Sequence, residues 1–225
     1  MRSADITYIN LEGPLVSNCP LTDTGMKFCG QLANVEGLVG AGVDVASLAN
    51  NHASNYGQAG LEETVQALQT SDIAVTGRGS PAILTKNNTL VSFVSFDDIS
   101  RSVLLDQFIQ EIEDTRAISD LVVVTFHWGT EYQATPNARQ ITLAHTAVDA
   151  GADLVIGAHP HWVQSKEIYR DKPIYYSLGN FVFDQDWSAE TKHGLAVRFT
   201  YQQNNLVLTE ELPVLIQNYG QPHWQ

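Results

Sequence analysis

The fold of this chain is decided by residues 121–161, LVVVTFHWGTEYQATPNARQITLAHTAVDAGADLVIGAHPH. The continuous apolar run at 121–126 is typical of a buried strand. A helix is predicted over 137–150, and a second apolar strand over 154–156. This strand–helix–strand order favours an α/β fold.

The same alternation continues on both sides of this stretch. Further strands are predicted over 5–10, 43–48, 73–76, 89–96, 163–169 and 174–176, and further helices over 31–41, 58–69 and 103–118. A closing hairpin is predicted over 194–201 and 206–215. The order indicates an α/β chain with at least one mixed sheet, and the late strands suggest a second sheet packed on the first.

Length and charge limit the classes of function. The 225 residues predict one domain, 1–225. Twelve Lys and Arg against 25 Asp and Glu give a net charge of −13, which argues against binding nucleic acid or anionic lipid. A polyanionic substrate would need a cation in the site. No apolar run approaches the length of a membrane span, and residues 1–5 lack the apolar segment of a signal peptide, so neither is predicted.

The two cysteines, Cys19 and Cys29, lie in a predicted loop. Two ordinary thiols are the favoured interpretation, although the spacing permits a disulfide in an oxidising compartment. The spacing is not that of zinc ligands.

Polar side chains of metal-binding type follow strand after strand, where ligands of open α/β sheets bind. The residues at these strand ends are Asn10, Glu12, Asn50, Asn51, His52, His127, Glu131, His159, His161 and Asn180. Singly, most have an ordinary structural explanation, such as turn and cap chemistry for the asparagines. Together they predict one polar rim.

The histidines carry the strongest signal in this set. Residues at i and i+2 of a strand point the same way, and Pro160 stiffens the turn, so His159 and His161 predict a metal chelate. Glu131 is a candidate to orient His127 as a hydrogen-bond acceptor, with a solvated loop carboxylate as the alternative.

One carboxylate (Glu12), one amide oxygen (Asn51) and the three imidazoles form a mixed N/O donor set, which suits Mn, Fe, Zn or Co. A carboxylate can bridge two metals ~3.5–4 Å apart, as in hydrolytic sites. His52 is then free to act as a general acid. Arg78, between two glycines, is a candidate anion clamp or, more commonly, a plain turn cation. Ser177 lacks the G-x-S-x-G context of a nucleophile, and the chain has neither a P-loop nor G-x-G-x-x-G.

The strand-end residues fall within a series of short motifs. These are NLEGP at 10–14, LANNHA at 48–53, YG at 56–57, HWGTEY at 127–132, GAHPH at 157–161 and YSLGNF at 176–181. In this order, over residues 5–185, the series resembles the CapA family of poly-γ-glutamate capsule biosynthesis proteins, relatives of the calcineurin-like metallophosphoesterases.

The resemblance implies a four-layer α/β/β/α sandwich with two divalent transition metals at its rim. It implies that Glu12 is the bridging carboxylate, that Asn51 is an amide ligand and that His52 is the acid. His127 and His159 resemble ligands of one metal, and His161 a ligand of the other. Asn10, Asn50, Glu131, Asn180 and Arg78 are expected to support the ligands or contact substrate, Asn180 as a family marker without an assigned role.

Family members usually begin with a strand ending in Gly-Asp, before the Asn-Leu-Glu motif. Here the sequence starts at the strand before Asn10, so we expect the first strand and its metal-binding Asp to be missing from it. A membrane anchor would lie in that same region. The resemblance implies a place in the cell envelope, or on the outer face of the membrane.

Two functions of different class follow. One is a metal-dependent hydrolase or transferase in capsule biosynthesis, which acts on an anionic polymer or a phosphoester alongside other capsule synthesis proteins. The other is a non-catalytic subunit for polymer binding or export on the same fold. The Asn51-His52 pair together with His159 and His161 favours the enzyme. A third interpretation, an α/β domain with structural histidines, is the weakest.

Overall fold

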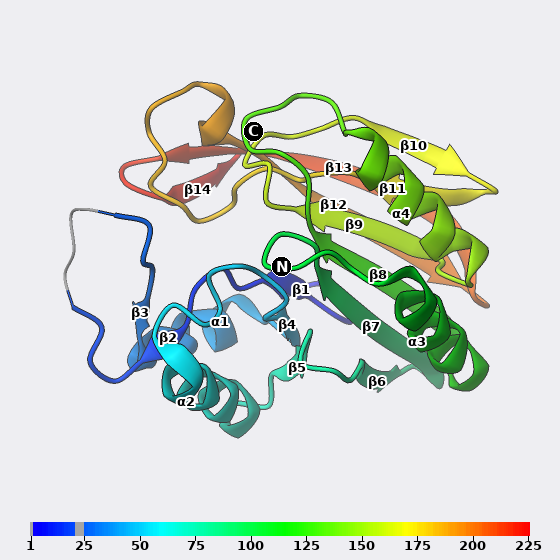
Figure 1. Ribbon diagram of the computed structural model, residues 1–225, viewed down its shortest axis with the longest axis horizontal. Helices are drawn as coiled ribbons and strands as arrows, with labels where there is room; N and C mark the ends of the chain where they lie inside the picture. Colours follow the sequence, from blue (N-terminus) through cyan, green and yellow to red (C-terminus); the bar gives the residue numbers. More distant parts are fainter. Residues whose placement is uncertain (1, 21–24) are drawn as a thin grey trace.

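The computed structural model describes residues 2–20 and 25–225. Its main elements form four layers in the order helix, sheet, sheet, helix (Figure 1). The predicted α/β/β/α sandwich is therefore confirmed.

The first sheet is small and entirely parallel. Its order is β1 (Tyr8–Asn10), β4 (Val45–Ser47) and β5 (Ala74–Thr76), with β1 at one edge. The helices α1 (Val35–Ala41) and α2 (Gly57–Thr70) lie on its outer side, α1 after a short 3₁₀ turn at Leu32–Asn34. That the family's first strand is missing from this sequence stays a prediction.

The second sheet is mixed and has the order β10-β11-β9-β8-β7-β6. Its strands are β6 (Ala82–Lys86), β7 (Thr89–Asp97), β8 (Leu121–His127), β9 (Leu154–Ala158), β10 (Lys166–Tyr169) and β11 (Lys172–Tyr175). The four central strands are parallel and the two edge strands are antiparallel to their neighbours. Helices α3 (Leu105–Ile118) and α4 (Ala138–Asp149) cover its outer face. Asn137 caps α4 through a reciprocal pair of hydrogen bonds with Gln140.

Alternation along two buried strands shows how the layers pack, since successive side chains of a strand point to opposite faces. In β4, Ala46 packs against the helices α1 and α2, while Val45 faces the second sheet. In β8, Val122 and Val124 pack against α3 and α4, while Val123 faces the first sheet. Both strands are thus apolar on both sides, which is why β8 appears in the sequence as a continuous apolar run.

The C-terminal strands form a sheet of their own, β12 (His193–Gln202), β13 (Asn205–Gln217) and β14 (Gln221–Trp224). The late strands were expected to supply the sheet packed on the first one. These strands do pack on the mixed sheet, since Glu211 of β13 accepts from Tyr175 of β11 and Phe199 of β12 contacts the Tyr175 ring. The expectation was incomplete, because β1, β4 and β5 form another sheet that also faces the mixed one. Phe199 of β12 packs at the edge of the core between the two main sheets. A 3₁₀ turn at Glu190–Lys192 precedes β12.

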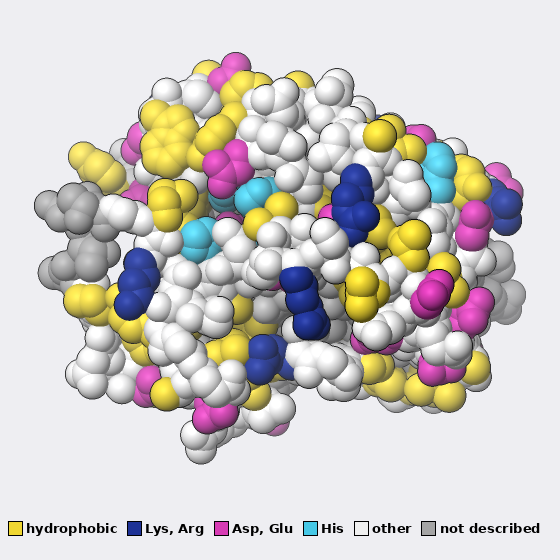
Figure 2. Space-filling model, viewed as in Figure 1, with side chains coloured by type: hydrophobic (Ala, Val, Ile, Leu, Met, Phe, Trp, Pro, Cys, Tyr) yellow, Lys and Arg dark blue, Asp and Glu magenta, His cyan; other side chains and the backbone are white. Residues whose placement is uncertain are grey.

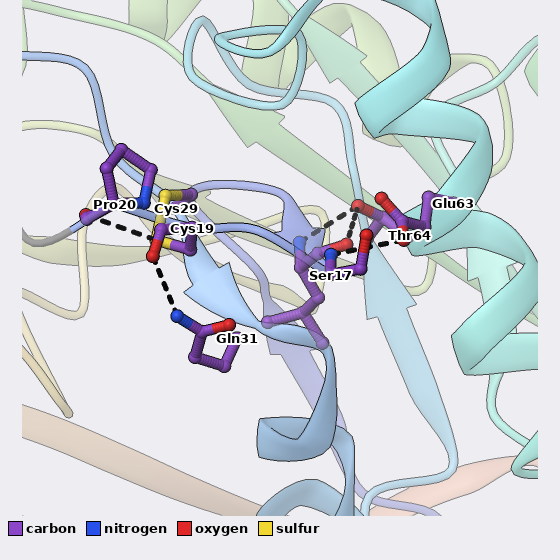
Figure 3. The surroundings of a disulfide bond; sticks show 8 residues. Ser17, Cys19, Pro20, Cys29, Gln31, Glu63 and Thr64 are labelled. Atoms are coloured by element: carbon purple, nitrogen blue, oxygen red, sulfur yellow. Dashed lines mark hydrogen bonds between the residues drawn. A yellow bond between two sulfur atoms is a disulfide. The ribbon is translucent and has the colours of Figure 1, made fainter.

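Cys19 and Cys29 form a disulfide, with Cα atoms 5.7 Å apart (Figure 3). The expectation of two ordinary thiols was therefore wrong. The pairing follows from the local fold, because the parallel strands β2 (Leu15–Val16) and β3 (Gly30–Gln31) bring the ends of the loop together. The Thr64 hydroxyl of α2 exchanges hydrogen bonds with the backbone of Leu15, which fixes this segment on the helix.

Most predicted elements are present with ends shifted by a few residues, and β6, β14 and the short pair β2 and β3 were not predicted. Among the helices of the described residues, none is long and apolar enough to cross a membrane.

Candidate metal centre

The carboxyl ends of strands from both sheets meet at one rim. Glu12 follows β1, Asn51 follows β4, His127 ends β8, and His159 and His161 follow β9. Figure 2 shows histidine side chains in a hollow near the middle of one face, bordered by hydrophobic side chains. The rim therefore gathers the predicted ligands from segments far apart in the sequence.

Glu12 lies at the centre of this group. Its Oε1 is 3.7 Å from His127 Nε2 and 3.9 Å from His161 Nε2. The Asn10 amide donates to the other carboxylate oxygen, Oε2, at 3.3 Å. Asn50 in turn donates to Asn10 Oδ1 at 3.2 Å, which links the ends of β1 and β4. The carboxylate is thus held by one oxygen and presents the other to the imidazoles.

The surroundings of Glu12 disfavour its charge. Burial, and secondarily the negative charge of Glu131, raise the pKa of Glu12 to about 7. Neither nearby imidazole compensates, because burial is also the main cause that lowers the pKa of both His127 and His161. The short distances are therefore contacts between a carboxylate and neutral imidazoles rather than ion pairs.

The three imidazoles are buried and neutral at physiological pH. His127, His159 and His161 are 1%, 9% and 4% exposed. Burial, with the neighbouring His161 and His52, lowers the pKa of His159 to about 4. Neutral imidazole is the form that ligates a metal.

His159 and His161 point into the site from a turn rather than from a strand. The strand β9 ends at Ala158, and both histidines have positive φ, 99° and 59°. Both rings face the site, as predicted. The predicted reason, alternation along a strand, was wrong, because the two residues lie in a turn. The Tyr132 backbone N–H donates to Pro160 O at 2.8 Å and holds the turn.

Asn51 and His52 take different places in the rim. Asn51 Oδ1 lies 2.8 Å from His127 Nε2, beside the central carboxylate. His52 is 7% exposed and packs against Phe28, with ring centroids 4.4 Å apart. Asn55 Nδ2 lies 3.1 Å from His52 Nδ1, and the same amide nitrogen donates to Met26 O. Asn55 therefore presents a donor to Nδ1, which leaves the ring proton of neutral His52 on Nε2.

The other predicted residues lie in three places. Asn180 accepts from His161 at 2.8 Å, and its own contacts are buried. Glu131 groups with His159 and His161, not with His127 as predicted, because Nε2 of His127 faces Asn51 and its Nδ1 has no hydrogen-bond partner in the described residues. Arg78 is exposed and lines a shallow hollow with α2, where it stays a candidate clamp.

Several residues of the site were missed from the sequence. Asp97 ends β7 opposite His127 in the sheet register, and the strand-end rule that found His127 would have found it too. Asn55, Phe28 and Gln185 lie in loops, and their positions depend on tertiary contacts. Aromatic rings also surround His161: Phe183 stacks on it at 5.4 Å and Tyr132 at 6.0 Å.

The donor set fits divalent metal ions. One atom each of Glu12, His127 and His159 lie within 4.8 Å of one another, as do atoms of Glu131, His159 and His161. Oε1 of Glu12 and Nδ1 of His159 are buried without a hydrogen-bond partner in residues 2–20 and 25–225. Buried polar atoms normally have a partner, and a cation would supply one here. Carboxylate and imidazole ligands suit Mn, Fe, Zn or Co.

Comparison with known proteins agrees with the motif series. A family model described as "Bacterial capsule synthesis protein PGA_cap" matches residues 1–185. The chain belongs to this family. The PGA_cap match includes every strand end that supplies a candidate ligand, and it ends where Gln185 contacts Asn180.

Two curated relatives are similar over most of the chain. The capsule biosynthesis protein CapA of Bacillus anthracis is 32% identical over 250 residues, which cover 99% of this chain and 60% of the relative. The PGA biosynthesis protein CapA of Bacillus subtilis (strain 168) is 30% identical over 236 residues, 95% of this chain and 62% of the relative. The chain thus spans about three fifths of the length of these PGA_cap relatives.

A solved structure shares the fold. A hypothetical protein from Thermus thermophilus superposes with a TM-score of 0.59 at 16% identity, covering 94% of this chain and 88% of the other. At this identity the likeness concerns the fold of the PGA_cap chain alone.

Proposed function

We propose that this chain carries a metal-dependent hydrolase site that acts on an anionic polymer of the bacterial surface, with poly-γ-glutamate as the substrate class. The observation that carries the proposal is the buried Glu12 carboxylate, which faces neutral imidazoles and receives no hydrogen bond at Oε1 from the described residues. The polymer is inferred from the family and from the names of the relatives.

The residues of the rim would hold two divalent ions. Glu12, Asn51, His127 and His159 would hold one, and His161 and Glu131, with Glu12 as the bridge, would hold the other. When bound, such ions supply Lewis acidity and activate water as a nucleophile. They would also offset the net charge of −13, which otherwise repels an anionic substrate.

His52 is the proton donor in this proposal. Because Asn55 faces Nδ1, the proton of His52 is on Nε2. Phe28 covers one face of the ring at 4.4 Å and limits its rotation. Burial lowers the pKa of His52, so the neutral ring predominates and presents its Nε2–H as a hydrogen-bond donor to the leaving group of either a phosphoester or a γ-glutamyl amide. Full proton transfer would come from the protonated ring.

The proposed setting is the cell envelope, where other capsule synthesis proteins would be its partners. This part of the proposal rests on the family alone.

Turnover after metal loading tests the enzyme. The chain, reconstituted with Mn²⁺ or Zn²⁺, is incubated with poly-γ-glutamate and with a chromogenic phosphodiester. His52→Gln should lower kcat at least ~100-fold while metal content stays unchanged, because general acids contribute about 10²–10⁴-fold. His145→Gln is the matched control, since His145 stacks on Tyr169 outside the site.

The alternative, a non-catalytic subunit for polymer binding or export, predicts a different result. The metal-loaded chain would then bind poly-γ-glutamate saturably, without turnover and with equal affinity in the His52→Gln variant. That result would contradict the hydrolase.

A further inference from the structure

Asn180 lies directly behind the ring of His161. Its Oδ1 is 2.8 Å from His161 Nδ1, and the two side chains belong to residues that are 8% and 4% exposed. On the other side of the ring, His161 Nε2 faces Glu12 Oε1 at 3.9 Å. The imidazole thus bridges Asn180 and the centre of the candidate metal site.

The orientation of the Asn180 amide is fixed by its other partners. Nδ2 donates to the backbone carbonyl of Thr191 at 2.9 Å and to Gln185 Oε1 at 3.0 Å. A flipped amide would place Oδ1 against the Thr191 carbonyl, which can only accept. Two buried acceptors would then face each other without a proton, which disfavours the flip. Oδ1 therefore stays toward His161.

This orientation decides where the ring proton of His161 lies. A carbonyl oxygen can only accept, so His161 must donate from Nδ1. In the neutral ring, Nε2 then carries the lone pair, and that lone pair points toward Glu12.

The backbone around Asn180 is held as firmly as its side chain. Gly179 pairs with Gly194 at the start of β12, and Leu195 N–H donates to Leu178 O at 2.8 Å. A Cβ on Gly194 would lie 1.7 Å from Asn180 O, so only glycine allows this approach. The C-terminal sheet thus supports the residue behind His161.

We propose that Asn180 is a positioning residue that holds His161 in its Nδ1–H tautomer and so presents the Nε2 lone pair to a metal ion. The proposal deepens the proposed function and rests on its metal site. His161 is singled out among the three imidazoles, because Nδ1 of His127 and Nδ1 of His159 have no hydrogen-bond partner in the described part of the chain.

The first test reads the tautomer directly. Long-range ¹⁵N–¹H correlation spectra of the metal-free full chain, recorded at mildly alkaline pH, distinguish a protonated from an unprotonated Nδ1. Wild type should show His161 protonated at Nδ1. Protonation at Nε2 would overturn the proposal with no variant needed.

The second test measures zinc affinity by titration calorimetry. Asn180→Ala removes the acceptor and should weaken binding about 10–100-fold, as the loss of such partners typically does. It should also shift His161 toward the Nε2–H tautomer. Asn180→Asp keeps an acceptor oxygen toward His161 and should retain both the tautomer and the affinity. It should lose stability, because its second oxygen then faces the Thr191 carbonyl.

Gln164→Leu is the matched control. Gln164 is also a buried amide that donates to two backbone carbonyls and accepts one hydrogen bond, from Gln140, but none of these partners is a candidate ligand. The variant should lose stability and keep its zinc affinity. Equal affinities in Asn180→Ala and Gln164→Leu would overturn the proposal.

The outcomes also separate this proposal from the function it rests on. A wild-type chain that binds no zinc overturns the proposed metal site. If wild type binds zinc but His161 is protonated at Nε2 in the metal-free chain, only the role of Asn180 is overturned.

Discussion

At the scale of single residues, the rim shows a conflict between stability and metal binding at Glu12. Its side chain is 16% exposed, and Oε1 faces His127 and His161 without a hydrogen-bond donor from the described residues. A bound cation would satisfy this oxygen, whereas in the metal-free chain its charge is only destabilising.

Glu12→Gln should therefore stabilise the metal-free chain. Because folding raises the pKa of Glu12 from 4.5 to about 7, the wild type loses stability as the pH rises through that window. At about 1.36 kcal/mol per pH unit, the variant should be more stable by about 3 kcal/mol at about pH 8 and by about 1 kcal/mol at about pH 5. Urea unfolding in EDTA measures this difference.

The control is Glu36→Gln, which removes an exposed carboxylate from α1. Its unfolding free energy should change equally little at both pH values. A Glu12→Gln variant less stable than wild type at the higher pH would show that the carboxylate has partners other than those described.

At the scale of elements, the disulfide holds the segment that carries Phe28. Cys29 follows Phe28 directly, and the Cys19 carbonyl accepts from Gln31 at 2.7 Å. The segment reaches the site through the contact of Phe28 with His52. The disulfide-bonded segment therefore connects β2 and β3 with His52, the proposed acid.

Cys19→Ser/Cys29→Ser should lower the free energy of unfolding by about 3 kcal/mol, the value for a closed loop of about 10–15 residues. Dithiothreitol should lower the stability of wild type by a similar amount and leave the double variant unchanged. Urea unfolding with and without the reductant measures both. Insensitivity of wild type to reduction would mean that β2 and β3 hold the segment without the bond.

Gly157, near the end of β9, controls how closely β9, β11 and Trp128 approach. A Cβ there would lie 2.0 Å from Tyr176 O and 2.3 Å from Trp128 Nε1, which are hydrogen-bonded to each other at 2.8 Å. Gly157→Ala should cost about 3 kcal/mol and weaken metal binding, because the histidine turn starts two residues later. Thermal unfolding and zinc titration measure the two effects.

Gly40 of α1 offers the opposite case. Nothing lies within 4 Å of a Cβ built there, and alanine is the better helix former, so Gly40→Ala should gain about 0.5–1 kcal/mol. A tolerated Gly157→Ala with unchanged zinc affinity would contradict the packing described at β9.

At the scale of the whole molecule, the residue pattern predicted an α/β chain with a polar rim at its strand ends, and the family resemblance supplied the four layers. The apolar run at 121–126 and the histidines after it were sufficient to predict β8, β9 and the metal-type cluster. The sequence could not show that β1 and β4 belong to a different sheet from β8, because that pairing depends on contacts distant along the chain. The partners of Asn180 were hidden for the same reason, since Thr191 lies in a turn without a motif.

The central claim is that one rim built by two sheets binds two divalent metal ions. Elemental analysis of the chain, purified without chelator and then equilibrated with Mn²⁺ or Zn²⁺, tests it most directly. The account predicts about two ions per chain in wild type and loss of both in His159→Ala/His161→Ala, because the double variant removes one imidazole ligand from each proposed ion site. It also predicts stabilisation of wild type by about 2.7 kcal/mol for each bound ion at a free metal concentration of about 100 times Kd. Fewer than one ion per folded wild-type chain, with unfolding unaffected by metal, would contradict it.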